Sequence, residues 1–146
     1  MAYRFASDKA QCCSEGGGQH WTISDTAGNL DAVTSFDLVI VGGGQLIGVA
    51  LGDYDTDQDR VVIDVTGCYE LPVVAHNNAE TGVAIGVGDW LYVDDADSEI
   101  NRDFIDGIAF GQAMEAVDSD DEATICVKLW PVPYVDILAA IAAAVE

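Results

Sequence analysis

The sequence predicts a mainly β fold, a small barrel or sandwich built from a duplicated strand–turn–strand unit and followed by a short C-terminal helix. Val and Ile together account for 28 of the 146 residues and Gly for another 15, a mixture that favours short strands joined by tight turns. Acidic or Gly-rich turns separate the apolar runs, and one glycine-bounded motif occurs twice. A chain of this length forms one domain of ordinary size.

The strand candidates are apolar runs rich in β-branched residues, at residues 21–23, 36–41, 46–51, 61–65, 90–93, 104–110 and 124–130. The last run alternates, with Val127 and Leu129 on one face and Lys128 on the other. The run 36–41 is wholly apolar after Asp37, which predicts a strand covered on both faces. In so small a domain, the second cover could be another subunit.

The glycine-bounded motif at residues 48–52 recurs at residues 107–111, offset by 59 residues. Each copy is followed by an acidic loop, a strand and a proline, Pro72 or Pro131, and each is preceded by a strand that begins with Asp, at 37–41 or 89–93. The shared order predicts two copies of one unit. The alternative is chance convergence of β-turn sequences.

The C-terminal segment 136–146 is Ala-rich, and Asp136 stands where a negative charge favours a helix N-terminus. A helix of this length is marginal alone, so its apolar stripe must dock on the domain, on a sister subunit or on another partner. The stripe consists of Ile137, Leu138, Ile141 and Val145. We therefore expect three segments: an N-terminal arm at 1–20, a β domain at 21–133 and a C-terminal helix at 134–146.

The charge balance excludes several kinds of partner. The chain has 26 acidic and five basic residues, a formal net charge of −21, and the basic residues are scattered singly. Nucleic-acid binding needs a basic stripe, and an anionic membrane would repel this surface. No apolar run reaches the ~20 residues of a membrane-spanning helix, and the first ten residues lack the apolar stretch of a signal peptide. We expect synthesis in the cytoplasm, without export.

The acidic residues are mostly Asp, 19 of the 26. In molar salt the screening length falls to about 3 Å, so that repulsion between these charges largely disappears. This predicts a halophilic source. The alternative is an ordinary acidic protein that its charge keeps soluble.

Alternating aspartates suggest a calcium loop. Asp53, Asp55, Asp57 and Asp59 could direct oxygen ligands at one ion, as in an EF-hand. The sixth position of such a loop is Gln58 instead of Gly, and the twelfth is Asp64 instead of a bidentate Glu. We expect no built metal site and at most loosely bound calcium or other cations. The alternative is a solvated acidic turn.

Other candidate sites are weaker. Residues 36–44 look like the strand and Gly-rich turn of a dinucleotide fold, but the third glycine position is Ile47 and no helix follows, so we expect a glycine hairpin and no cofactor. His20 and His76 lie outside recognisable nucleophile motifs, so we expect no enzyme. The four cysteines, Cys12, Cys13, Cys68 and Cys126, form no C-x-x-C pair and favour reduced, partly buried thiols.

Four pieces in order resemble the capsid decoration (cement) proteins of tailed phages. They are the Asp-led strand running into glycines at 37–44, the run at 46–51, the strand and Leu-Pro segment at 61–72, and the segment at 87–94 followed by 107–111 and the closing strand to Trp130. Each piece alone is ordinary β-turn sequence, and their order carries the resemblance. The acidity, the N-terminal segment and the C-terminal helix depart from the family pattern.

The resemblance implies a compact β domain that forms a homotrimer. It also implies a place in the virion, on the outer surface of an icosahedral capsid, with the major capsid protein as partner. With the charge argument, it suggests a virus of a halophilic host. We expect contacts to the capsid or to sister subunits from Tyr3, Phe5 and Trp21 near the N-terminus and from Ile137, Leu138 and Ile141 in the helix. The alternatives are a calcium-dependent β-rich interaction module and a spike or vertex component of a virion.

Overall fold

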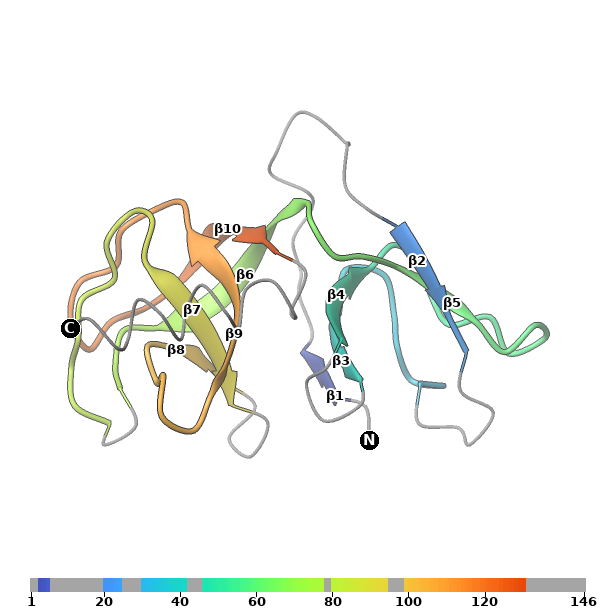
Figure 1. The fold of residues 1–146 in the computed structure, drawn as a ribbon, viewed down its shortest axis with the longest axis horizontal. Helices are drawn as coiled ribbons and strands as arrows, with labels where there is room; N and C mark the ends of the chain where they lie inside the picture. Colours follow the sequence, from blue (N-terminus) through green and yellow to red (C-terminus); the bar gives the residue numbers. More distant parts are fainter. Residues whose placement is uncertain are drawn as a thin grey trace.

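The structure, a computed structural model, describes residues 3–5, 20–24, 30–41, 46–77, 80–94 and 99–130. These residues form ten strands in two antiparallel five-stranded sheets, which lie side by side (Figure 1). The mainly β prediction is confirmed: the sheets pack in a sandwich-like arrangement and do not close into one barrel. The predicted helix at 134–146 lies outside the described residues.

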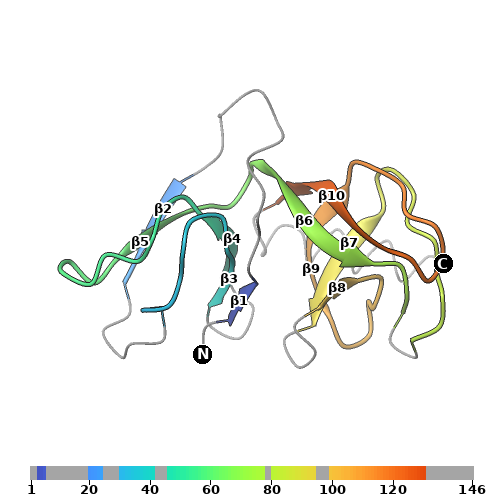
Figure 2. The ribbon, with the colours of Figure 1, turned by 180° about the vertical axis from the view of Figure 1, so that it is seen from behind.

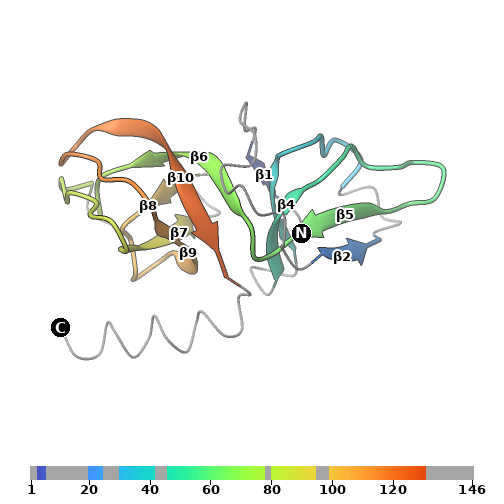
Figure 3. The ribbon, with the colours of Figure 1, turned by 90° about the horizontal axis from the view of Figure 1, so that it is seen from above.

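Sheet A contains, in spatial order, β1 (Tyr3–Phe5), β3 (Leu38–Val41), β4 (Leu46–Ala50), β5 (Val61–Asp64) and β2 (His20–Ile23). Sheet B contains β6 (Cys68–Val74), β10 (Glu122–Leu129), β9 (Ile108–Ala113), β7 (Trp90–Asp94) and β8 (Glu99–Asn101). The chain crosses between the sheets from β5 to β6 (Figure 2). Seen from above, β5 and β2 lie at the end of the molecule that is farthest from sheet B (Figure 3).

The main core lies between the sheets and is made by the inward faces of both. Leu38 and Ile40 of β3 pack in one buried cluster with Leu91 of β7, Phe110 of β9 and Val127 of β10. Burial of these aliphatic and aromatic side chains is the chief stabilising term for a domain of this size. Because side chains alternate along a strand, Leu38 and Ile40 lie on the same face of β3.

A second core covers the opposite face of sheet A. Val39 of β3 and Ile63 of β5 pack there against three loop residues. Leu30 and Val33 precede β3, and Tyr54 lies between β4 and β5. The predicted strand at 36–41 is therefore covered on both faces, and the second cover comes from the same chain. No sister subunit is needed to bury β3.

The two copies of the glycine motif lie on strands with similar neighbours but at opposite ends of them: residues 48–52 run past the end of β4, and residues 107–111 begin just before β9. Residues 48–52 lie at β4, the neighbour of β3 and β5, and residues 107–111 lie at β9, the neighbour of β7 and β10. A Cβ at Gly48 would lie 2.9 Å from the Asp64 carbonyl oxygen, and one at Gly111 would lie 2.7 Å from that of Lys128. Both glycines permit close approach of the following strand.

Three strands were not predicted: β1, β6 and β8. Pro72 interrupts the β6 sequence, but β6 is an edge of sheet B, where the missing N–H of a proline costs no ladder hydrogen bond. The prediction of a strand beginning at Phe104 is wrong, because residues 103–107 form a turn and β9 begins at Ile108. Among the described residues, no helix is long and apolar enough to cross a membrane.

Candidate functional site

Of the contact residues predicted from the sequence, the three that the structure describes do not gather in one place. Tyr3 and Phe5 lie in β1, which pairs with β3 of the same chain, so residues 3–5 extend the chain's own sheet. Trp21 lies in β2, at the opposite edge of sheet A, with 39% of its surface exposed. Ile137, Leu138 and Ile141 lie outside the described residues. The predicted capsid or subunit contacts of all six stay predictions.

The acidic loop between β4 and β5 is held by its own backbone. The Asp55 carboxylate accepts hydrogen bonds from the N–H groups of Asp57, at 2.9 Å, and Gln58, at 3.2 Å. Asp53 accepts one from the Ser35 N–H at 3.0 Å, and Asp59 has a φ of 52°. In the described part of the chain, no three Asp, Glu, His or Cys side chains are placed to hold one metal ion. Loose cation binding by this loop stays a prediction.

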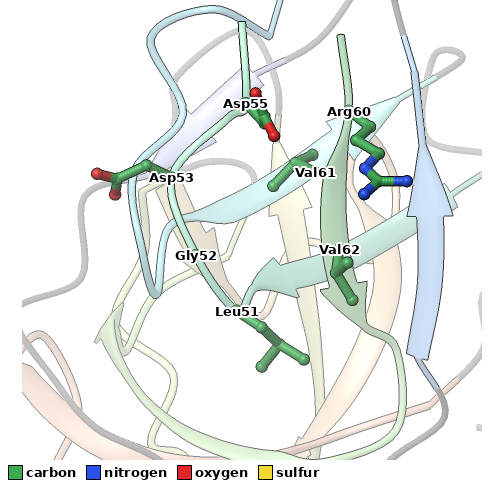
Figure 4. A pocket seen from close by; sticks show the side chains of 7 residues that line it. All are labelled: Leu51, Gly52, Asp53, Asp55, Arg60, Val61 and Val62. Atoms are coloured by element: carbon green, nitrogen blue, oxygen red, sulfur yellow. The ribbon is translucent and has the colours of Figure 1, made fainter. Parts of the chain in front are cut away.

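A pocket of about 350 Å³ lies beside this loop (Figure 4). Its wall is aliphatic, with the Arg60 guanidinium toward β2 and two carboxylates on the facing loop. The lining residues are Leu51, Gly52, Asp53, Asp55, Arg60, Val61 and Val62. None of them is a hydroxyl, thiol or imidazole side chain, and both carboxylates already accept backbone N–H groups.

A buried polar network joins the two sheets. Asp64, 1% exposed at the end of β5, accepts hydrogen bonds from the Thr66 and Gly67 N–H groups, both at 3.0 Å, and from the Tyr69 hydroxyl at 2.6 Å. Burial raises the pKa of Tyr69 well above its usual range, and the hydrogen bond and charge of Asp64 raise it further. The phenol therefore stays protonated as a donor to the carboxylate.

Lys128 of β10 completes this network. Its ammonium group donates to the Thr66 carbonyl and, at 3.1 Å, to the Leu129 carbonyl, and it lies 4.9 Å from the centre of the Trp130 ring. Burial lowers the pKa of Lys128, and the negative charge of Asp64 opposes that shift. These groups bind backbone and one another, which is the arrangement of a structural junction.

The cysteine prediction needs correction. Cys68 in β6 and Cys126 in β10 are each disulfide-bonded, whereas reduced thiols were expected. The spacing of the cysteines in the sequence carries no signal for this, because disulfide pairing depends on which cysteines the fold brings together. Cys12 and Cys13 lie outside the described residues.

The two histidines have different surroundings. His20 is exposed in β2, and His76, after β6, contacts the Glu99 carboxylate of β8 through its Nε2 atom. The Arg102 N–H donates to the His76 carbonyl at 2.9 Å. These contacts bring together β6 and β8, the two edge strands of sheet B. His76 thus joins the ends of these two strands.

Among the described residues, two consecutive large apolar side chains are exposed in the β8–β9 turn, residues 102–107. Phe104 is 51% exposed and Ile105 62% exposed, and the adjacent Asp106 is exposed as well. The Asp103 carboxylate, which is buried, accepts the N–H groups of Ile105 and Asp106, both at 3.0 Å. A buried acid thus fixes a turn whose apolar residues face solvent. We call Phe104, Ile105 and Asp106 the apolar tip.

Comparison with known proteins identifies a protein family. The model of a family described as phage cement protein matches residues 18–129, which include β2 to β10 and therefore nearly all of both sheets. No curated protein and no solved structure matches the chain.

Proposed function

The chain belongs to the phage cement protein family, and from this membership we propose that it decorates the outer surface of an icosahedral capsid and stabilises the shell. The observation that carries the proposal is the family match over residues 18–129. A structural, capsid-associated role needs no catalytic group.

The partner in this proposal is the major capsid protein, and the protein is made in the host cytoplasm before it joins the virion. Each subunit adds contact area across a junction between shell subunits, opposing the outward pressure of packaged DNA. A homotrimer would strengthen such binding, because linked weak contacts act at high effective concentration. The contacts predicted for Tyr3, Phe5, Trp21 and the segment 134–146 belong to this proposal.

We further propose that the virus infects a halophilic host. The formal net charge of −21 supports this, because strong ionic screening removes the self-repulsion of so acidic a chain. On a virion, the same charge would keep particles from clumping.

The first test is quantitative mass spectrometry of purified virus particles from the source culture. We expect a copy number comparable to that of the major capsid protein. A few copies per particle would indicate a spike or vertex component instead, and absence from the particles would overturn the proposal.

A second test measures the cementing effect. Particles stripped of this protein should release their DNA at lower temperature than native particles, and adding the purified protein should restore the native value. An unrelated acidic protein of similar size serves as the control. Equal heat resistance with and without the protein would contradict a stabilising role even if the protein is a virion component.

A further inference from the structure

We propose that the apolar tip of the β8–β9 turn inserts into an apolar pocket, rimmed by positive charge, on the capsid shell protein. This inference rests on the proposed function, and it assigns the contact to named residues. Phe104 and Ile105 are consecutive, and each has more than half of its surface exposed. Single exposed apolar side chains are ordinary on protein surfaces, whereas large apolar side chains that lie together beside polar residues are typical of docking surfaces.

The turn is ordered before any partner binds. The Asn101 side-chain oxygen accepts the Asp103 N–H at 2.9 Å, the Asp103 carboxylate accepts two N–H groups of the tip, and the Asp103 carbonyl accepts the Gly107 N–H at 3.1 Å. Asn101 and Asp103 are each 3% exposed. Binding by a fixed turn loses less conformational entropy than binding by a flexible loop.

The turn is also fastened to sheet B. The Phe104 ring packs against the Tyr92 ring, with centroids 6.5 Å apart and planes at 57°. Tyr92 belongs to an apolar cluster with Ala109, and Trp90 and Trp130 pack against it. A force on the tip is therefore transmitted to β7 and β9, as the attachment of a shell-stabilising protein requires.

Gly107 closes the turn at its other end. A Cβ at this position would lie 2.5 Å from the Asp103 carbonyl oxygen and 2.8 Å from the Tyr92 Cβ. The turn can therefore press against β7 only because residue 107 has no side chain. Gly107 therefore permits the tight turn that exposes Phe104 and Ile105.

Charge favours the shell protein over a second copy of this chain. Asp106 places an exposed acid beside the two apolar side chains. A contact between the tips of two copies would bring these acids together at close range, whereas a pocket rimmed by Lys, Arg or backbone N–H groups would complement them. Two side chains also bury far less than the roughly 800 Å² per partner of a stable stand-alone interface. We therefore infer that the tip makes one of several contacts between each copy of the protein and the capsid shell.

The test is co-sedimentation of the purified protein with stripped capsid shells. The variant carries Phe104→Ser and Ile105→Ser together, and Val87→Ser is the matched control because Val87 is 70% exposed but lies outside the turn. Circular dichroism and thermal unfolding establish that both variants fold. We expect the double variant to bind at least tenfold more weakly, roughly the loss on removing a central apolar contact, and the control to bind like wild type.

A second variant tests the charge. Asp106→Lys should weaken shell binding and reduce its salt dependence, because it places a cation against the positive rim. Equal binding of the double variant and wild type would overturn the inference while leaving the proposed function intact. If wild type itself does not sediment with shells, the proposed function fails first. If the double variant instead loses self-association in light scattering, the tip is a subunit contact and the inference is wrong.

Discussion

The hydroxyl of Tyr69 donates to the Asp64 carboxylate across 2.6 Å, and this bond joins the last residue of β5 to the second residue of β6. It lies where the chain passes from sheet A to sheet B. The carboxylate also accepts the N–H groups of Thr66 and Gly67, so it fixes the connection between the two sheets. This junction sets how the inward faces of the sheets meet around the main core.

Replacing Tyr69 by Phe should destabilise the protein by about 1–3 kcal/mol, because it leaves a buried carboxylate oxygen without its hydroxyl donor. Urea unfolding, followed by circular dichroism, measures the change. A double-mutant cycle with Asp64→Asn separates the bond from the loss of either side chain alone. A coupling energy near zero between the two substitutions would contradict the importance of this bond.

The same residue should make stability fall at alkaline pH. The pKa of Tyr69 is raised in the folded protein, mainly by burial, whereas the unfolded chain loses the proton near pH 10. The contribution of this group is therefore fully present below pH 10 and declines as pH rises from there toward the folded pKa. The lowered pKa of Lys128 acts in the opposite sense, since the unfolded chain then binds the extra proton.

The measurement is the free energy of unfolding of wild type and Tyr69→Phe between pH 8 and pH 11, at constant ionic strength. We expect the wild-type curve to fall more steeply above pH 10 than the curve of the variant. Titration of all other groups is common to both proteins and cancels in the difference. Parallel curves would show that Tyr69 does not carry the alkaline dependence.

The glycine motif gives a prediction with an internal control. Gly52 and Gly111 are each the last glycine of the motif in the sequence, but Gly111 lies within β9 and Gly52 lies after β4. A Cβ at Gly111 would lie 2.7 Å from the Lys128 carbonyl oxygen, whereas one at Gly52 would meet no atom within 4 Å. Gly111→Ala should force β9 and β10 apart and destabilise by about 1–3 kcal/mol. Gly52→Ala should be neutral or stabilise by up to about 1 kcal/mol, because it restricts the unfolded chain.

Thermal unfolding of the two alanine variants measures these effects, because a change of about 1 kcal/mol in the free energy of unfolding moves the unfolding midpoint by roughly 2–4 °C for a chain near 150 residues. A similar loss in both would mean that general loss of glycine flexibility, and not the close strand approach at Gly111, sets the cost.

The strands of sheet A were largely predictable, because β3, β4 and β5 are short apolar runs between turn residues. β6 was missed because Pro72 breaks its pattern, and a single sequence does not reveal that the strand lies at a sheet edge. The recurrence of the glycine motif at residues 48–52 and 107–111 indicated two similar strand arrangements, and each sheet contains one. It could not indicate how they pack.

The candidate sites were less predictable, because side chains far apart in sequence create them. Lys128 and Asp64 belong to one network, yet no periodicity relates residues so distant in the chain. The apolar pair Phe104 and Ile105 resembled the start of a strand. A signal for a turn was present, since Asp103 begins the segment and Gly107 ends it, but apolar content outweighed it in the strand prediction.

Asp55→Ala distinguishes a structural loop from a calcium loop. The Asp55 carboxylate accepts two N–H groups of its own turn, so its loss should destabilise by about 0.5–2 kcal/mol, equally in calcium and in EDTA. Asp57→Ala, at an exposed neighbouring position, is the control and should have little effect in either buffer. Destabilisation by both substitutions in calcium alone would instead support the calcium-dependent module.

The acidic composition predicts that stability rises with salt. Raising KCl from 0.1 M to 1 M shortens the screening length from about 10 Å to about 3 Å, which weakens repulsion among the exposed acids. We therefore expect the unfolding midpoint to increase steeply over this range and to level off above it. Salt also strengthens apolar burial in any protein, so the increase alone does not identify electrostatic screening.

A charge-reduced variant separates the two causes. Asp118, Asp120 and Asp121 are exposed in the turn before β10, and changing all three to Asn removes three negative charges while keeping side-chain shape. Asn also tolerates the φ of 67° at position 120. The variant should be more stable than wild type in low salt and should approach it in high salt. An identical salt dependence in both proteins would attribute the effect to apolar burial and remove the charge argument for a halophilic host.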